Sequence, residues 1–220
     1  MYLKHVCSCL VSYYYIAATE VETNVGGVSE RATIMSEEGF EALCKDVGID
    51  PYADAFALQI LHAMAAEDPS NISFDQFRRG MVSMQASNAA ELKSRRAKLE
   101  ADVRSDRKTF LRFWAHAFVA NREPGMKVVS VDVVKGLLAM LSPDWALLVE
   151  FEAFLDTKKV VSLDTWKQLL RFQREVKPDL SGYEDDMSWP TTIDEFVVFV
   201  NKRRGGAGAD AGAAAGGGGK

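Results

Sequence analysis

A repeat of apolar residues with the period of an α-helix constrains the fold of this chain more than any other feature. In the segment from Ser36 to Gly48, the serine is suited to cap a helix and the glycine to end it. The apolar face of this helix consists of Phe40, Leu43, Cys44 and Val47. The period recurs, and we expect further helices at about residues 54–66, 76–84, 88–105, 108–121, 130–141, 143–155, 163–176 and 192–202. No long alternating strand pattern interrupts them, so the sequence predicts an all-α fold.

Side chains suited to start helices support this interpretation. Ser130 stands directly before one apolar stripe and is suited to cap it. Thr192 and Glu195 have the spacing of a capping box, in which each side chain bonds the backbone of the other residue. The link around Ile72 is short and extended. We therefore expect a helical bundle whose first part contains helix pairs joined by short loops.

Composition limits the class of protein. With 220 residues, 48% of them hydrophobic, the chain can bury the core of one domain or of two small ones. The net charge is −5 and no run of Lys and Arg is long, so we expect no nucleic-acid partner. Cys7, Cys9 and Cys44 are too few and too unevenly spaced for a disulfide framework or a zinc site. We expect no metal or other cofactor, and a location in the cytoplasm, the nucleus or both.

The two ends of the chain differ from the helical part. Residues 6–18 are mostly apolar and follow Lys4, a layout shared with signal peptides, but serines and tyrosines interrupt the run. The run is also too short to span a bilayer, so we expect an irregular leader at residues 1–30 and no membrane partner. Residues 205–220 are Gly and Ala apart from one Asp and the final Lys, which predicts a flexible tail.

A stretch of one charge sign precedes and enters the last expected helix. Residues 179–195 contain six carboxylates and no Lys or Arg, and Trp189 and Pro190 stand among them. A large aromatic residue within one-sign charge, beside a proline that fixes the chain before a helix, is typical of a site for a basic partner. A solvated acidic loop whose tryptophan fills the core accounts for the same pattern. The residues alone leave both interpretations open.

Residues able to perform covalent chemistry are sparse. His62 and His116 fall within apolar helical stripes, and Cys44 lies on the apolar face of its helix without a nearby base. Nothing in the sequence desolvates the carboxylate pairs at residues 185–186 and 194–195. We therefore expect no catalytic residues. A hydrolase or transferase with an unfamiliar site remains an alternative.

The link at residues 67–75 resembles the loop of an EF-hand because several of its side chains carry oxygen. Calcium binding in such a loop requires a central glycine and a glutamate at the twelfth position. Counted from Asp68, the twelfth residue is Arg79, and the glycine is missing. Ile72 suits the short strand that pairs two such modules. The segment predicts an EF-hand-like shape without the ion, and a helical calcium sensor or adaptor protein is kept as an alternative function.

Several motifs, taken in order, resemble the defective-in-cullin-neddylation family and its potentiating-neddylation domain. The motifs are Cys44–Pro51, the aromatic-rich Phe110–Gly125, Asp164-Thr165-Trp166, and Asp179–Phe196 with its Trp-Pro-x-x-Ile-Asp-Glu-Phe end. The resemblance covers about residues 36–203. It implies a domain at residues 31–204, in which an EF-hand-like part at 31–88 precedes a cullin-binding, helical subdomain at 89–204.

The resemblance implies a scaffold-type component of a cullin neddylation ligase. Such proteins perform no covalent chemistry themselves. They bind a cullin C-terminal domain and the neddylation conjugating enzyme, whose acetylated N-terminus enters an apolar groove. The aspartate–alanine–aspartate cullin patch of the family falls here on Asp164, Ser188 and Asp194, with a serine in place of the alanine. The groove implied by the family would be lined by Phe40, Leu43, Cys44, Ile60, Met64, Phe113 and Phe118.

Overall fold

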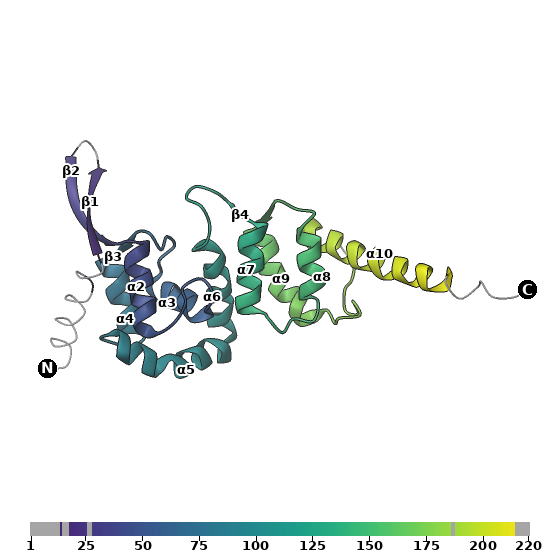
Figure 1. The fold of residues 1–220 in the computed structure, drawn as a ribbon, viewed down its shortest axis with the longest axis horizontal. Coiled ribbons are helices and arrows are strands. Elements are labelled where there is room, and N and C mark those ends of the chain that lie inside the picture. The colour runs from purple at the N-terminus through teal and green to yellow at the C-terminus, as the bar shows by residue number, and fades with distance from the viewer. Residues whose placement is uncertain (1–13, 15–17, 26–27, 186–187, 214–220) are drawn as a thin grey trace, which may run out of the picture. The chain divides into compact units, whose positions relative to one another are not determined.

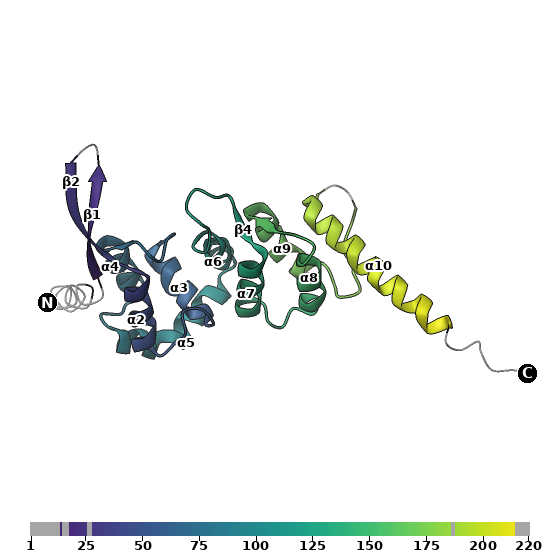
Figure 2. The ribbon, with the colours of Figure 1, turned by 45° about the horizontal axis from the view of Figure 1, so that its top comes forward.

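The computed structural model describes Tyr14 and residues 18–25, 28–185 and 188–213, and within residues 21–32 and 206–213 it describes the backbone alone. The described residues form two compact units, divided between Met126 and Lys127. Each unit is built mainly of helices joined by short loops (Figures 1 and 2). The predicted all-α fold is therefore confirmed. The rest of the predicted leader lies outside the described residues.

The first unit contains a β-hairpin and a group of helices. Its elements are β1 (Ala18–Val25), β2 (Val28–Met35), α2 (Glu37–Val47), α3 (Ala55–Met64), β3 (Ile72–Ser73), α4 (Phe74–Ser83), α5 (Ala89–Ser105) and α6 (Arg107–Val119). Helix α5 packs on α2 and α3, and the Gln59 amide of α3 donates to the Leu99 carbonyl of α5 at 2.7 Å. Because α6 in turn packs on α3 and α5, this unit continues to Met126, beyond residue 88 where the sequence analysis divides the domain.

The second unit is a smaller group of helices with one short strand pair. Its elements are β4 (Val128–Ser130), α7 (Val131–Leu141), α8 (Leu148–Leu155), β5 (Val160–Ser162), α9 (Leu163–Glu175) and α10 (Thr191–Ala213). Figures 1 and 2 show α10 continuing past α8 to the end of the described chain. Within the described chain, none of the helices combines the length and apolar character needed to cross a membrane.

In each unit, two strands pair antiparallel over two or three residues directly before a helix. β2 pairs with β3 through Met35 and Ile72, and both side chains are fully buried. β4 pairs with β5 through Val129 and Val161, which are also buried. The β4–β5 pair joins the loops of two helix–loop–helix segments, α6 to α7 and α8 to α9, as the strands of paired EF-hands do. The β2–β3 pair joins the loop between α3 and α4 to the second strand of the hairpin. The short extended link around Ile72, predicted from the sequence, therefore pairs as expected.

Several helix boundaries follow the capping residues that the sequence predicts. The Ser36 hydroxyl accepts from the Gly39 amide at 3.4 Å, and Gly48 ends α2 with a left-handed φ of 84°. The Ser130 hydroxyl accepts from the Val133 amide at the start of α7. Such caps satisfy backbone groups that have no partner within the helix. These predicted boundaries are confirmed. The sequence could predict them because each cap depends only on residues close to it in the chain.

Other boundaries differ from the prediction. Helix α8 begins at Leu148 rather than at about residue 143, and no side chain caps it. The predicted capping box of Thr192 and Glu195 is wrong: α10 already begins at Thr191, and the carbonyl of Pro190 accepts its first bond. Helix α10 also continues to Ala213, into the segment predicted to be a flexible tail.

A β-hairpin occupies part of the segment predicted to be an irregular leader. β1 and β2 pair antiparallel from Ala18 opposite Met35 to Val25 opposite Val28. Figures 1 and 2 show the hairpin projecting from the helices of the first unit, with its base beside β3. The sequence does carry a local signal for this hairpin, Gly26-Gly27 between two runs that contain Val and Thr, and the prediction of an irregular segment overlooked it.

Tyr14 connects the chain before the hairpin to the core of the first unit. Its side chain is fully buried, and its hydroxyl lies 2.8 Å from the carbonyl oxygen of Thr33 and 2.9 Å from that of Ile72. Its ring also packs on Phe74 and Phe77 of α4, with centroids 5.2 and 5.4 Å apart. The tyrosine therefore bonds at the junction of β2 and β3 and packs on the helix that follows β3.

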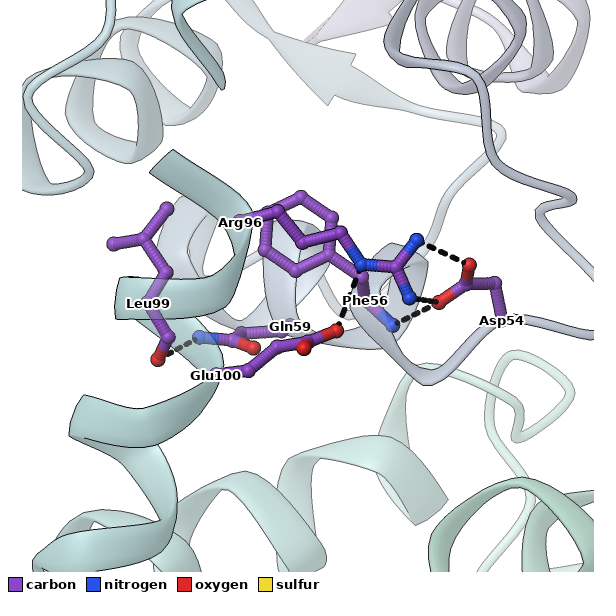
Figure 3. Close-up of polar contacts among 6 residues, drawn as sticks. All are labelled: Asp54, Phe56, Gln59, Arg96, Leu99 and Glu100. Atoms are coloured by element: carbon purple, nitrogen blue, oxygen red, sulfur yellow. Dashed lines mark hydrogen bonds and ion pairs between the residues drawn. The ribbon is translucent and has the colours of Figure 1, made fainter. Parts of the chain in front are cut away.

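An ion-pair network fastens α5 to the start of α3 (Figure 3). Asp54 caps α3 by accepting from the Phe56 amide at 2.9 Å. The guanidinium of Arg96 binds the same carboxylate through two nitrogens, at 2.8 and 2.9 Å, and its Nε donates to Glu100 at 2.9 Å. It also lies 5.5 Å from the ring centre of Phe56. A forked pair of this kind is stronger and more specific than a single contact between mobile surface charges.

Replacing Arg96 by methionine is expected to lower the free energy of unfolding by about 1–2 kcal/mol, because it removes the forked pair and its stacking while keeping an apolar stem. Arg78→Met is the matched control. Its guanidinium contacts Asp75 once, at 3.2 Å, and both side chains are more than half exposed, so the expected loss is below ~0.5 kcal/mol. Urea unfolding followed by circular dichroism measures both. An equal loss in the free energy of unfolding for the two variants would show that the Arg96 network stabilises the fold no more than a single surface ion pair does.

Candidate functional site

Acidic side chains occupy the first turns of two helices in the second unit. Asp164 is exposed in the first turn of α9, which Ser162 caps by accepting from the Thr165 amide at 3.1 Å. Asp194 is half-buried in the first turn of α10. A helix N-terminus carries partial positive charge, so a carboxylate interacts favourably with its helix at either position. No Lys or Arg in the described part of the chain forms an ion pair with Asp164 or Asp194, so both can attract a basic partner.

Trp189 anchors the segment that leads into α10. Its side chain is 7% exposed and meets Phe172 of α9 nearly edge to face, with ring centroids 5.7 Å apart. The guanidinium of Arg171 lies 4.4 Å from the centre of its ring. The carbonyl of Pro190 then accepts from the Ile193 amide at 2.7 Å, which starts α10. The tryptophan therefore fills the core, and it fixes the acidic segment around it at the same time.

Two polar contacts fix the first turn of α10. Lys158 lies just before β5, and its Nζ is 2.6 Å from Oε2 of Glu195. The hydroxyl of Tyr183 donates to Oδ1 of Asp194 at 2.8 Å. The fold therefore neutralises Glu195 with a cation but gives Asp194 a neutral donor. Sequence reasoning missed Tyr183, although it stands in the acidic motif, because its partner is 11 residues away and only the folded loop joins them.

The structure places all three predicted cullin-binding residues in the second unit. Asp164 lies on α9, Ser188 is exposed just before α10, and Asp194 lies on α10. Helices α9 and α10 pack together through Phe172 and Phe196, whose ring centroids are 5.8 Å apart. That the three residues bind one partner together stays a prediction.

The predicted groove residues all lie in the first unit and are closed to solvent. They come from α2 (Phe40, Leu43, Cys44), α3 (Ile60, Met64) and α6 (Phe113, Phe118), and each is at most 5% exposed. The five from α2 and α3 belong to one apolar cluster. Met64 lies directly against the backbone of α4 at Gly80, where a Cβ would come within 2.4 Å of the Met64 side chain. These residues therefore form core, and their role in a groove stays a prediction.

Comparison with known proteins identifies the family. Residues 91–199 match the family model described as Cullin binding. "DCN1-like protein 5" of Rattus norvegicus is 30% identical over 174 residues, which cover 78% of this chain and 73% of that protein. The chain belongs to the DCN1-like family. "DCN1-like protein 4" of Homo sapiens is 27% identical over 199 residues, covering 89% of this chain and 63% of that protein. "DCN1-like protein 2" of Dictyostelium discoideum is 30% identical over 171 residues, covering 76% of this chain and 63% of that protein.

Membership in the DCN1-like family confirms the resemblance predicted from the motifs. The range that matches the cullin-binding family runs from α5 to α10 and includes Asp164, Ser188 and Asp194. The family consists of cullin-binding scaffolds, so membership supports a role for this chain in cullin neddylation.

The thiol of Cys44 is poorly suited to nucleophilic chemistry in this DCN1-like chain. Burial raises its pKa to about 12, and the nearby carboxylates Asp54, Asp50 and Glu41 act in the same direction. A thiol is reactive mainly as its thiolate, which is scarce at neutral pH when the pKa is this high. Cys44 therefore behaves as a small apolar residue of α2.

Two histidines meet between α3 and α6. The rings of His62 and His116 have centroids 5.1 Å apart, and His62 also meets Phe113 edge to face. Burial lowers the pKa of His116 to about 4, and the neighbouring His62 adds to this effect. Burial, together with Arg112, also lowers the pKa of His62. Within the described residues, neither ring nitrogen of His116 makes a hydrogen bond of ordinary geometry.

Because the folded state favours neutral His116, its contribution to stability is present above pH 6.5 and is lost as the pH falls towards 4. The loss by pH 4 is about 2–3 kcal/mol, since the unfolded chain binds the proton first. His116→Phe removes the titrating group and keeps a ring beside His62. We expect urea unfolding to show that the free energy of unfolding of the variant rises relative to that of the parent chain as the pH is lowered from 7.5 to 5. A parent–variant difference that does not change with pH would contradict the burial argument.

Proposed function

We propose that this DCN1-like protein is a non-catalytic scaffold of a cullin neddylation ligase, acting in the cytoplasm, the nucleus or both. One surface, made by Asp164, Ser188 and Asp194, binds a cullin C-terminal domain, and an apolar groove of the first unit binds the neddylation conjugating enzyme. The observation that carries the proposal is the pair of first-turn carboxylates without a cationic partner among the described residues, within the range that matches the cullin-binding family.

The acidic surface suits a basic partner for electrostatic reasons. Residues 179–195 carry no Lys or Arg, and Lys158, which reaches the start of α10, pairs with Glu195 rather than Asp194. A basic side chain of the partner therefore meets negative charge that the described fold has not cancelled. Complementary charge speeds encounter and fixes the register of the two proteins.

A scaffold that holds both partners accelerates transfer without reacting itself. Holding the cullin and the conjugating enzyme on one chain replaces an encounter between separate molecules by an encounter at high effective concentration. It also limits the orientations in which the acceptor lysine meets the loaded enzyme. Tethering and orientation of this kind need no catalytic side chain.

The groove would accept an apolar, uncharged N-terminus. The predicted lining forms the closed core of the first unit, so a ligand would first contact the partly buried apolar residues packed on the same cluster. These include Ala63, Phe74 and Leu99. A free ammonium group is costly to bury in such surroundings, whereas an acetylated terminus carries no charge.

Reversing the charge of Asp194 tests the cullin surface. Asp194→Lys is expected to weaken binding to a cullin C-terminal domain at least about 30-fold, since losing a partner of an interface charge pair costs ~2–5 kcal/mol. Asp132→Lys is the matched control, because Asp132 is likewise acidic and lies in the first turn of a helix of the same unit, α7, where it is exposed. Isothermal titration calorimetry measures both affinities. If Asp194→Lys binds as well as the parent chain, the proposed surface is wrong.

The acetyl group tests the groove. A peptide from the N-terminus of the conjugating enzyme is expected to bind about tenfold or more tightly when acetylated than as the free amine. Fluorescence anisotropy of labelled peptides measures both, with an acetylated peptide of scrambled sequence as control. The Asp194→Lys variant should bind the acetylated peptide as the parent does, because its change lies in the other unit. Equal affinity for the acetylated and free peptides would overturn the groove and leave the cullin surface standing.

A further inference from the structure

The carboxylate of Asp194 has a neutral donor that orients it. Tyr183 reaches it from the loop between α9 and α10, with its hydroxyl 2.8 Å from Oδ1. Both side chains are half-buried. A carboxylate bonded through one oxygen loses rotational freedom before any partner arrives, and its second oxygen remains for that partner. A tyrosine hydroxyl adds no positive charge, so the bond orients Asp194 without cancelling its attraction for a basic group.

The ring of Tyr183 is itself held by Trp189. The two rings are nearly parallel, at 26°, with centroids 6.5 Å apart. Trp189 is fixed in turn by Phe172 and by the guanidinium of Arg171, which lies 4.4 Å from its ring centre. The hydroxyl that bonds Asp194 is therefore part of a chain of packed groups that begins on α9.

The backbone before Tyr183 is also fixed. The Ser181 carbonyl accepts from the Lys177 amide at 3.0 Å, and the Asp179 carboxylate accepts from the Ser181 amide at 2.9 Å. Gly182 has a left-handed φ of 93°, and a Cβ there would lie 2.5 Å from the carbonyl oxygen of Glu175, at the end of α9. Only glycine fits so close to another backbone in this conformation. These contacts therefore restrict the backbone of Tyr183 to one position.

We propose that Tyr183 is a positioning residue of the cullin-binding surface, which fixes the Asp194 carboxylate in the orientation that receives a basic side chain of the cullin. The inference rests on the proposed function, because it assigns a role within the same surface. Tyr183 acts through Asp194 and is not assigned a contact with the cullin. Preorganisation of this kind raises affinity by reducing the freedom lost on binding.

Removing the hydroxyl alone tests the proposal. Tyr183→Phe keeps the ring that stacks on Trp189 and is expected to weaken binding to a cullin C-terminal domain about three- to tenfold, the usual cost of ordering one freed side chain on binding. Tyr52→Phe is the matched control. Tyr52 is 65% exposed in the first unit, and its hydroxyl also donates to carboxylates, those of Glu37 and Glu41. Calorimetry should show unchanged affinity for the control, and thermal unfolding should show that both variants are folded at the temperature of the binding measurement.

A double-mutant cycle separates positioning from a general loosening of the loop. In an Asp194→Ala background, where the acceptor of the Tyr183 hydroxyl is gone, Tyr183→Phe should cost no further affinity. If Tyr183→Phe instead disturbed the loop in general, it would lower the affinity further in that background as well, and this result would overturn the proposal. Wild-type affinity of Tyr183→Phe in the parent background would overturn it as well.

The outcomes also separate this inference from the proposed function. If Asp194→Lys abolishes cullin binding while Tyr183→Phe binds like the parent chain, the acidic surface stands and the role of Tyr183 is wrong. If the parent chain does not bind the cullin domain, or Asp194→Lys binds as the parent does, the proposed surface and the role of Tyr183 fall together.

Discussion

The candidate cullin-binding surface depends on the burial of Phe196. This residue lies in the same turn of α10 as Asp194 and Glu195 and is fully buried. Its ring packs against rings from the turn before α8, from α8 and from α9, with centroid distances between 4.9 and 6.3 Å: Trp145, Phe151, Phe154 and Phe172. Aromatic packing of this extent contributes several kcal/mol by burial and edge-to-face contact. Because it fixes the rotation of α10, it decides which side of the helix presents the carboxylates.

The sequence predicted those parts of the fold that neighbouring residues determine. Helix α2 begins and ends where Ser36 and Gly48 predict, because a cap and a left-handed glycine act within one turn. The pairing of β2 with β3 could not be predicted in this way, since it joins residues far apart in the chain. The start of α8 was placed too early for a related reason. Trp145 has helical spacing to the apolar residues that follow, but it belongs to a hydrogen-bonded turn and reaches the core from there.

The candidate site was predictable to a similar degree. The acidic residues could be assigned because their charge and their place in a family motif are visible in the sequence. The distinction between Asp194 and Glu195 was not visible. These neighbours have the same charge, yet one receives the hydroxyl of Tyr183 and the other an ion pair from Lys158. Both partners come from segments that only the folding of the second unit brings to the start of α10. The sequence therefore predicts where the charge lies, and the structure shows which carboxylate forms an ion pair within the chain.

Placing the acidic residues in first turns suits a surface that must bind without rearranging. The helix N-terminus interacts favourably with a carboxylate, so Asp164 and Asp194 stabilise their helices before any partner binds. A basic partner then adds an ion pair to a charge already held in place, and little conformational freedom is lost on binding. A mobile acidic loop with the same net charge would have to be ordered first. Rigid helix ends thus let a small number of carboxylates bind specifically where a larger number in a flexible segment would attract any basic surface.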